Sequence, residues 1–299
     1  MEQNITPTEM EQLRKKALRL IIVAIVCLAA AFALGAAVAP PFALLFIPAI
    51  ICFVFFSRAQ KTFAAAYKEN VVKSALNEVF TDISFTPAAG ITREELRETE
   101  MMQTGDRYSS NDLITGQYNG VPFRQSDVHI EEEHTDSEGH TSYTTIFRGR
   151  WMIFDFNKNF ASDLQVVGKR FGANKRKGGG LFGLFASKEK KMEKIELENE
   201  AFNKQFTVYA HDTTEAFYLL TPHIMEAMLR LREGIGSPIM LLFFRGQLHV
   251  AVNNGKDAFE PSIFRTYDPA RETESALADT RVITAFVDEM RLDNDIYKA

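Results

Sequence analysis

A run of 37 residues, from Leu20 to Phe56, contains no charged side chain. About 20 apolar residues cross the hydrocarbon core of a bilayer as a helix, so this run is long enough for two crossings. Pro40 and Pro41 stand in its middle. Proline interrupts a helix because it lacks an amide proton and clashes with the preceding turn. The run therefore predicts two membrane-spanning helices, residues 17–39 and 42–56, joined by a tight turn.

Basic residues flank this run on both sides: Arg14, Lys15, Lys16 and Arg19 precede it, and Arg58 and Lys61 follow it. Because basic residues beside membrane spans stay in the cytoplasm, both ends of the hairpin are expected there. The prediction is a multi-pass protein of the bacterial inner (cytoplasmic) membrane with both termini cytoplasmic. A cleaved signal peptide is disfavoured because the run is too long. A helical hairpin buried in a soluble protein remains the alternative.

The rest of the chain has the pattern of an α+β domain. We expect a cytoplasmic tail at 1–16, a two-helix transmembrane hairpin at 17–57 and a cytosolic α+β domain at 58–299. Helical spacing and capping residues indicate helices, and β-branched and aromatic runs between turn residues indicate strands. The predicted helices are 61–80, 93–102, 190–202, one beginning at 212, 221–234 and 274–292. The predicted strands are 112–118, 121–132, 143–156, 164–167, 206–209, 239–244 and 247–252.

Charge is unevenly distributed along the chain. Residues 169–194 contain nine Lys or Arg and two acidic residues, whereas the formal charge of the whole chain is −5. The remainder is therefore acidic, which argues against nucleic-acid binding because that function needs a broad basic face. The two cysteines, Cys27 and Cys52, lie within the apolar run. They read as small apolar side chains and cannot form a cysteine-based zinc site.

The basic segment 169–191 also carries four apolar side chains. A domain tethered to the cytoplasmic leaflet would hold such a segment near anionic lipid, where each Lys or Arg contributes about 1 kcal/mol of attraction. We expect it to form a reversible membrane contact; a docking loop for a protein partner and a solvated insertion are the alternatives. The predicted contact residues are Lys169, Arg170, Lys175, Arg176, Lys177, Leu181, Phe182, Leu184, Phe185, Lys188, Lys190 and Lys191.

Several stretches together resemble a bacterial family of membrane-anchored proteins of unknown function. They are "GITREELRETEMM", "DLITGQYNGVPFRQSDVHIEE", "FTVYAHDTTEAFYLLTPHIMEAMLRL" and "GQLHVAVNNGKDAFEPSIF". The resemblance covers about residues 17–292. It implies two N-terminal spans, one cytosolic domain and, for some members, genes near those of LemA-type membrane proteins. It supplies no catalytic residues.

Polar side chains offer two weak candidate sites. His129, His134 and His140 lie among acidic residues, and imidazole with carboxylate can hold a divalent ion, but a charged hairpin tip explains them better. The second candidate is His211-Asp212, with His223, His249 or distant acids as further ligands. Asp212 as a helix cap is the simpler interpretation. Glu260 is either a binding carboxylate or the partner of a nearby group such as Arg265.

These observations favour a non-enzymatic, membrane-anchored cytosolic scaffold or interaction domain. Its expected partners are the lipid bilayer and an unidentified protein, for which the resemblance suggests a LemA-type membrane protein. No cofactor, metal or catalytic residue is assigned. The alternative is an enzyme acting on a membrane-proximal substrate, with His211, Asp212, His223 and Glu260 as its candidate polar site. A deep apolar cavity with converging polar groups would favour the enzyme.

Overall fold

The computed structural model describes residues 5–35, 46–155, 163–171 and 192–292. The chain divides into two compact units. The helical unit consists of residues 1–78 and 259–279, and the sheet unit of residues 79–258 and 280–299. The boundary predicted at residue 58 separates the transmembrane hairpin from the cytosolic domain, whereas the two units are separated by compactness. The predicted boundary therefore stays a prediction.

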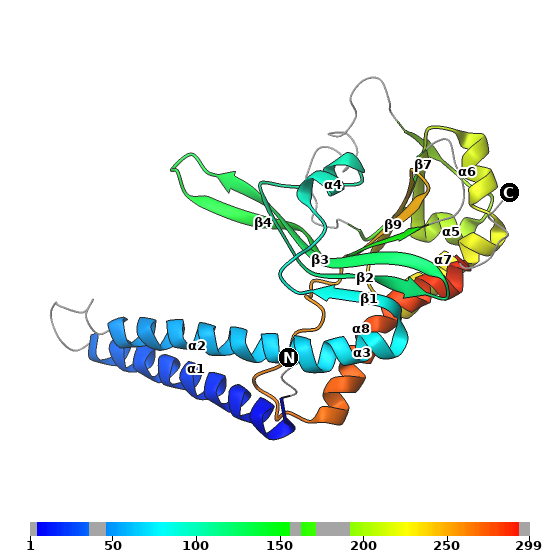
Figure 1. Ribbon diagram of the computed structural model, residues 1–299. Helices are drawn as coiled ribbons and strands as arrows, with labels where there is room; N and C mark the ends of the chain where they lie inside the picture. The colour runs from blue at the N-terminus through cyan, green and yellow to red at the C-terminus, as the bar shows by residue number, and fades with distance from the viewer. Residues whose placement is uncertain (1–4, 36–45, 156–162, 172–191, 293–299) are drawn as a thin grey trace. The chain divides into compact units, whose positions relative to one another are not determined.

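Two long helices form most of the helical unit. α1 (Pro7–Gly35) and α2 (Phe46–Tyr67) lie side by side in Figure 1, and the rings of Phe32 and Phe46 meet edge to face at 5.6 Å. The buried alanines of α1 are seven residues apart, at Ala17, Ala24 and Ala31. Buried residues of α2 repeat at the same interval: Ala49, Phe56 and Phe63. Small side chains at this spacing let two helices approach closely along one seam.

The second helix is longer than an apolar span. α2 runs through a π-helical turn, η2 (Lys68–Val72), into α3 (Lys73–Val79). In the described part of the chain, this stretch, Phe46–Val79, is the one helix long and apolar enough to cross a membrane. The helix predicted over 61–80 therefore continues the second apolar helix, as expected. Residues 36–45, which contain the predicted turn and the end of the first span, lie outside the described residues.

The sheet unit is built on an antiparallel sheet, which confirms the α+β class. Within the described residues the sheet has nine strands in the order β1-β2-β3-β4-β9-β8-β5-β7-β6. The strands are β1 (Thr81–Thr86), β2 (Arg107–Tyr118), β3 (Val121–Thr135), β4 (Thr141–Asp155), β5 (Leu164–Gly168), β6 (Glu193–Ile195), β7 (Phe206–Ala210), β8 (Ile239–Phe244) and β9 (Gln247–Val252).

The sheet carries apolar side chains on both faces. On one face Ile130, Phe147 and Trp151 pack with Leu96 of α4 (Arg93–Glu98). On the other face Phe154 meets Phe286 of α8 (Pro269–Met290) at 6.2 Å. The remaining helices of this unit are α5 (Glu200–Gln205), α6 (Thr213–Leu219) and α7 (Pro222–Ile235).

Two tight hairpin turns join pairs of strands that the sequence predicted. Asn119 and Gly120 both have positive φ between β2 and β3, and Arg245 and Gly246 do so between β8 and β9. A two-residue turn with positive φ at both central residues matches the twist of the paired strands.

The helix predicted over 190–202 is wrong. Its described part forms the edge strand β6 and then α5, which begins only at Glu200 under an Asn199 cap. Pairing of Ile195 with Val208 of β7 overrides the local helical preference. Strand β1 was not predicted, because its short and largely exposed residues carry little apolar pattern.

Candidate functional site

A loop of the C-terminal region is fastened to the start of α1 inside the helical unit. Arg14 donates two hydrogen bonds to the carboxylate of Glu11, both at 2.7 Å, and a third at 2.7 Å to the carbonyl of Ile263. Glu11 in turn accepts the amide proton of Tyr267 at 3.0 Å. One ion pair therefore holds both stems of the loop Ile263–Tyr267. The three residues between the stems are exposed: Phe264, Arg265 and Thr266.

The same C-terminal segment is also bound to the second helix. Lys68, the first residue of the π-helical turn, is 8% exposed and its ammonium lies 2.5 Å from the carboxylate of Glu260. The hydroxyl of Tyr67 donates to the carbonyl of Glu272 at 3.4 Å. π-helical turns in α-helices are frequent at functional sites. We call residues 259–272, with Glu11, Arg14, Tyr67 and Lys68, the clasp.

Replacing Glu11 with Gln should loosen the clasp. The hydrogen bonds that Arg14 and the Tyr267 amide donate to Glu11 lower its pKa to about 2, although burial of the carboxyl acts to raise it. A lowered pKa stabilises the fold above the ordinary value near 4.5, and the gain disappears as pH falls through about 2. Glu11→Gln leaves buried Arg14 without its counter-ion, so we expect a loss of about 2–4 kcal/mol at pH 7 that shrinks toward pH 2.

Thermal unfolding of the full chain in detergent between pH 2 and 7 measures this. Lys204→Gln is the matched control, because its 3.9 Å pair with Glu200 is exposed on both sides and contributes little. A constant difference between Glu11→Gln and the wild type at every pH would show that packing, not charge, accounts for the loss.

A row of buried polar side chains crosses the sheet unit. Asp112, Gln125, Asp127 and Arg150 are each at most 2% exposed. Asp127 pairs in register with Arg150, and Asp112 lies at a bulge of β2 with φ of 55°. Burial, with Asp112 and Asp257 as nearby like charges, raises the pKa of Asp127 to about 7, although Arg150 opposes the shift.

This row anchors the segment that follows β9. The amide of Ala258 donates to Asp127 at 2.6 Å, and Arg148 pairs with Asp257 at 3.0 Å. Asn253 accepts the amide proton of Arg148 at 3.3 Å. Residues 253–258 are thus held against β3 and β4 directly before the chain enters the clasp at residue 259.

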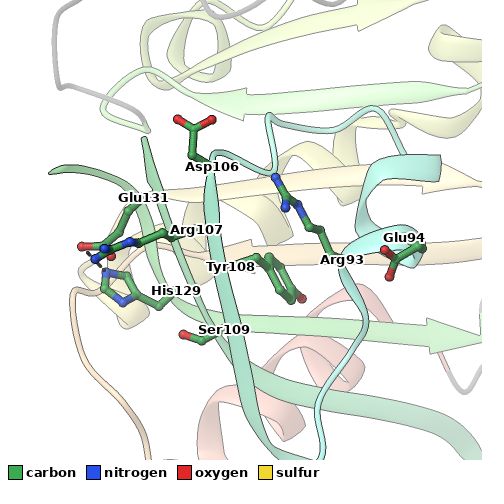
Figure 2. Close-up of a pocket in the computed structure, with 8 residues that line it drawn as sticks. All are labelled: Arg93, Glu94, Asp106, Arg107, Tyr108, Ser109, His129 and Glu131. Carbon is green, nitrogen blue, oxygen red and sulfur yellow. Dashed lines mark ion pairs between the residues drawn. The ribbon is translucent and has the colours of Figure 1, made fainter. Parts of the chain in front are cut away.

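A charged groove of about 680 Å³ lies beside β2, β3 and α4 and is drawn in Figure 2. His129 and Glu131 approach one another at 3.7 Å, and Arg107 stacks at 3.5 Å over the ring of Tyr143. Tyr108 donates to the carbonyl of Ile91 at 2.6 Å, and burial raises its pKa to about 12. The lining residues are Arg93, Glu94, Asp106, Arg107, Tyr108, Ser109, His129 and Glu131.

Several charged side chains of the groove are already engaged in contacts with their neighbours. Ser109 is opposite His129 in register, yet no hydrogen bond joins the two side chains among the described residues. Both arginines are engaged, since Arg93 also donates to the carbonyl of Gly105. Across the described ranges, no group of three His, Cys, Asp or Glu side chains is placed to hold a metal ion. The groove is open and polar, not a deep apolar cavity.

Of the candidate polar residues, His211, Asp212 and His223 belong to the sheet unit and Glu260 to the helical unit, so a site that joins them stays a prediction. His211 and His223 are exposed, and Asp212 caps α6 by accepting the amide protons of Thr214 and Glu215 at 2.7 and 3.3 Å. Glu260 belongs to the helical unit and pairs with Lys68 rather than with Arg265. His249 is buried in the sheet unit, where burial lowers its pKa to about 4 and Trp151 donates to its Nδ1 at 3.4 Å.

The predicted membrane-contact segment lies mostly outside the part of the chain that the structure describes. Residues 172–191 lie outside the described residues, so the contact predicted for them stays a prediction. Of its members only Lys169 and Arg170 are described, and both are exposed in the turn that follows β5.

The clasp residues Glu11, Arg14 and Lys68 were missed as functional candidates. Glu11 and Arg14 are three residues apart on a helix, a spacing that usually marks a solvated surface pair. One pattern in the sequence could have indicated these residues. In the segment 259–265, "FEPSIFR", two large apolar residues lie between a carboxylate and an arginine, outside any predicted helix or strand.

The comparisons with known proteins give a family match but no activity. Residues 145–292, just under half of the chain, match a family described as "Protein of unknown function (DUF3137)". The match supports the resemblance to an uncharacterised domain family; the two spans and the LemA-type association stay predictions. No curated protein matches the chain.

One solved structure shows a distant likeness. It is the crystal structure of the mycobacterial trehalose monomycolate transport factor A, TtfA, which is 9% identical. The match covers 77% of this chain and 95% of that one, with a TM-score of 0.39. A score this low carries no argument about the function of this chain.

Proposed function

We propose that the protein is a membrane-anchored cytosolic interaction module of the bacterial inner membrane. The helices α1 and α2 would cross the bilayer as a hairpin, and the sheet unit would stand on the cytoplasmic side to receive a protein partner. The observation that carries this proposal is the apolar surface of the two helices.

That surface is large and uninterrupted by charge. Of the 16 large apolar side chains exposed in the described residues, 12 belong to these helices: Ile22, Val23, Ile25, Val26, Leu28, Phe32, Ile47, Ile50, Ile51, Phe53, Val54 and Phe55. Soluble monomers rarely expose contiguous apolar patches of such extent, whereas lipid-facing helices require them. The buried residues of α1, by contrast, include the small side chains Ala17, Ala24 and Ala31, which favour close helix association within a membrane.

The length of the second helix fits a span that continues into the cytoplasm. At 1.5 Å per residue, the 34 residues of Phe46–Val79 extend about 51 Å. The hydrocarbon core of a bilayer is about 30 Å thick, so a substantial part of the helix would project beyond it. Arg58 and Lys61 would stand at the boundary, and the clasp would lie on the projecting part.

The partner face is proposed to be the charged groove with the projecting β3–β4 hairpin. Residues 131–142 of this hairpin contain five acidic residues and neither Lys nor Arg. Such a face complements a basic protein surface, and complementary charge sets specificity and association rate. A LemA-type protein remains one proposed partner.

Labelling of the two native cysteines tests the anchor. In membrane vesicles containing the full chain, Cys27 and Cys52 should not react with a water-soluble maleimide until the membrane is dissolved in denaturing detergent. Ser74→Cys, an exposed site on α3, is the control and should react in inverted vesicles but not in right-side-out vesicles. Fast reaction of Cys27 and Cys52 in intact vesicles of both orientations would exclude the hairpin, and reaction of Ser74→Cys in the opposite orientation would invert the topology.

A further inference from the structure

We propose that the loop Ile263–Tyr267 is a membrane-interface anchor that places Phe264 and Arg265 against anionic lipid headgroups. This inference rests on the proposed membrane function of α1 and α2. It assigns a second, extramembrane contact to the helical unit, separate from the basic segment 169–191.

The exposure of Phe264 is the first observation. Its side chain is 74% exposed, the largest value among the exposed large apolar side chains of the described residues. Its neighbour Ile263 is buried, and Arg265 is exposed. A single exposed phenylalanine is common on protein surfaces, so the fixing of the loop and its position, rather than the exposure alone, indicate a function.

The loop is fixed, which is the second observation. The Glu11–Arg14 pair holds the carbonyl of Ile263 and the amide of Tyr267, so the exposed tip is closed at both stems. Arg271 adds a hydrogen bond to the carbonyl of Thr266. Arg14 is only 5% exposed, which is unusual for an arginine. A tip ordered in advance loses little conformational entropy when it binds a surface.

The position of the tip identifies the surface. Arg14 lies five residues before Arg19, which corresponds to about 7.5 Å along α1. Arg19 and the uncharged run that follows mark the edge of the proposed span. Lys15 and Lys16 lie between Arg14 and this edge. The headgroup region of a bilayer adds about 5–7 Å on each side of the hydrocarbon core, so the level of Arg14, which holds the loop, lies at about the outer edge of this region.

The chemistry of the tip fits that region. Phenylalanine is among the apolar residues that interfacial segments bury at the headgroup boundary, and arginine binds phosphate while its stem covers apolar surface. Lys15, at 54% side-chain exposure, adds positive charge on the neighbouring helix. The occupant is therefore a lipid surface with anionic headgroups, which also explains why the tip contains no acidic residue.

Lipid quenching of a fluorophore at residue 264 tests the proposal. The full chain is placed in nanodiscs containing phosphatidylglycerol, with an environment-sensitive fluorophore on a single cysteine and the other native cysteines replaced by serine. The three positions compared are Cys27 in the proposed span, Phe264→Cys in the loop, and Ser74→Cys on α3. Residue 74 is 16 residues beyond Arg58, about 24 Å further along the helix, and serves as the aqueous reference.

We expect doxyl groups near the lipid headgroup to quench position 264 at least twofold more than position 74. Adding Glu11→Gln should lower this quenching, because the tip then loses its fixed stems. Emission at 264 equal to that at 74, with Cys27 still quenched, would overturn the anchor and leave the proposed function standing. Loss of quenching at Cys27 as well would overturn the membrane hairpin itself. Equal quenching in neutral and anionic nanodiscs would reject the role of anionic headgroups.

Discussion

Placing one arginine in each apolar helix, as Leu28→Arg with Ile50→Arg, should abolish stable membrane insertion. Both side chains are exposed, at 42% and 60%. An arginine near the centre of a span costs about 2.5–3.5 kcal/mol in insertion. Two such residues together should reduce the inserted fraction about a thousandfold or more. The measurement is the share of the full chain that remains in the membrane pellet after alkaline carbonate extraction.

This pair of substitutions separates the membrane hairpin from the soluble alternative. At a water-facing helix position, exchange of an exposed leucine or isoleucine for arginine changes stability by only about 0.5 kcal/mol. Phe217→Arg provides the matched control, since Phe217 is 47% exposed but belongs to the sheet unit. It should leave the pellet fraction unchanged. If the double variant behaved like this control, the apolar helices would face a protein or water rather than lipid.

Local chemistry explains which parts of the fold could be predicted. Thr6 and Glu9 form a capping box: the amide of Thr6 donates to the Glu9 carboxylate at 2.8 Å, and the amide of Glu9 donates to the Thr6 hydroxyl at 3.3 Å. Thr92 and Thr221 cap α4 and α7 by accepting the amide protons of Glu95 and Ile224. These signals depend on residues three apart, so a sequence contains all of the required information.

Features made by distant residues could not be predicted in this way. β6 has the composition of a helix and becomes a strand only because β7 offers it a partner. The clasp joins residues more than 190 positions apart, such as Lys68 and Glu260, and Arg14 with the carbonyl of Ile263. The seven-residue spacing of Ala17, Ala24 and Ala31 is different, because it is visible in the sequence and predicts the seam between α1 and α2.

The buried polar row leads to the second large expected effect. Replacing Asp127 with Asn should stabilise the sheet unit above pH 7 and have little effect near pH 4. The Asp127 carboxyl is 1% exposed, and burial raises its pKa to about 7, whereas the unfolded chain has the ordinary value near 3.8. The groups that face it are Arg150 on β4, Asp112 on β2, and Asp257 with the Ala258 amide on the segment after β9.

The sign of the pH effect follows from proton binding. Between about pH 4 and pH 7 the folded chain keeps a proton on Asp127 that the unfolded chain has released. Stability is therefore complete below the unfolded pKa and falls as pH rises toward the folded value. A difference of about three pKa units corresponds to at most about 4 kcal/mol. The asparagine side chain cannot ionise, so the variant should not show this loss, and its amide oxygen can still accept the proton of Ala258.

The fluorescence of Trp151 can report unfolding of the sheet unit. Trp151 is the single tryptophan of the chain, is fully buried, and lies in register with Ser126, next to Asp127. Denaturant unfolding followed by its fluorescence, on the full chain in detergent at pH 5 and pH 8, gives both stabilities. Asp127→Ala is the control; it cannot ionise either, but it removes the acceptor for Ala258, so it should be about 1–3 kcal/mol less stable than Asp127→Asn at either pH. If Asp127→Asn were destabilising by the same amount at pH 8 as at pH 5, Arg150 would be holding the carboxylate ionised against the cost of burial. In that case an ion pair would anchor the segment 253–258. A stabilising effect of Asp127→Asn at pH 8 would instead show that folding keeps the Asp127 carboxyl neutral.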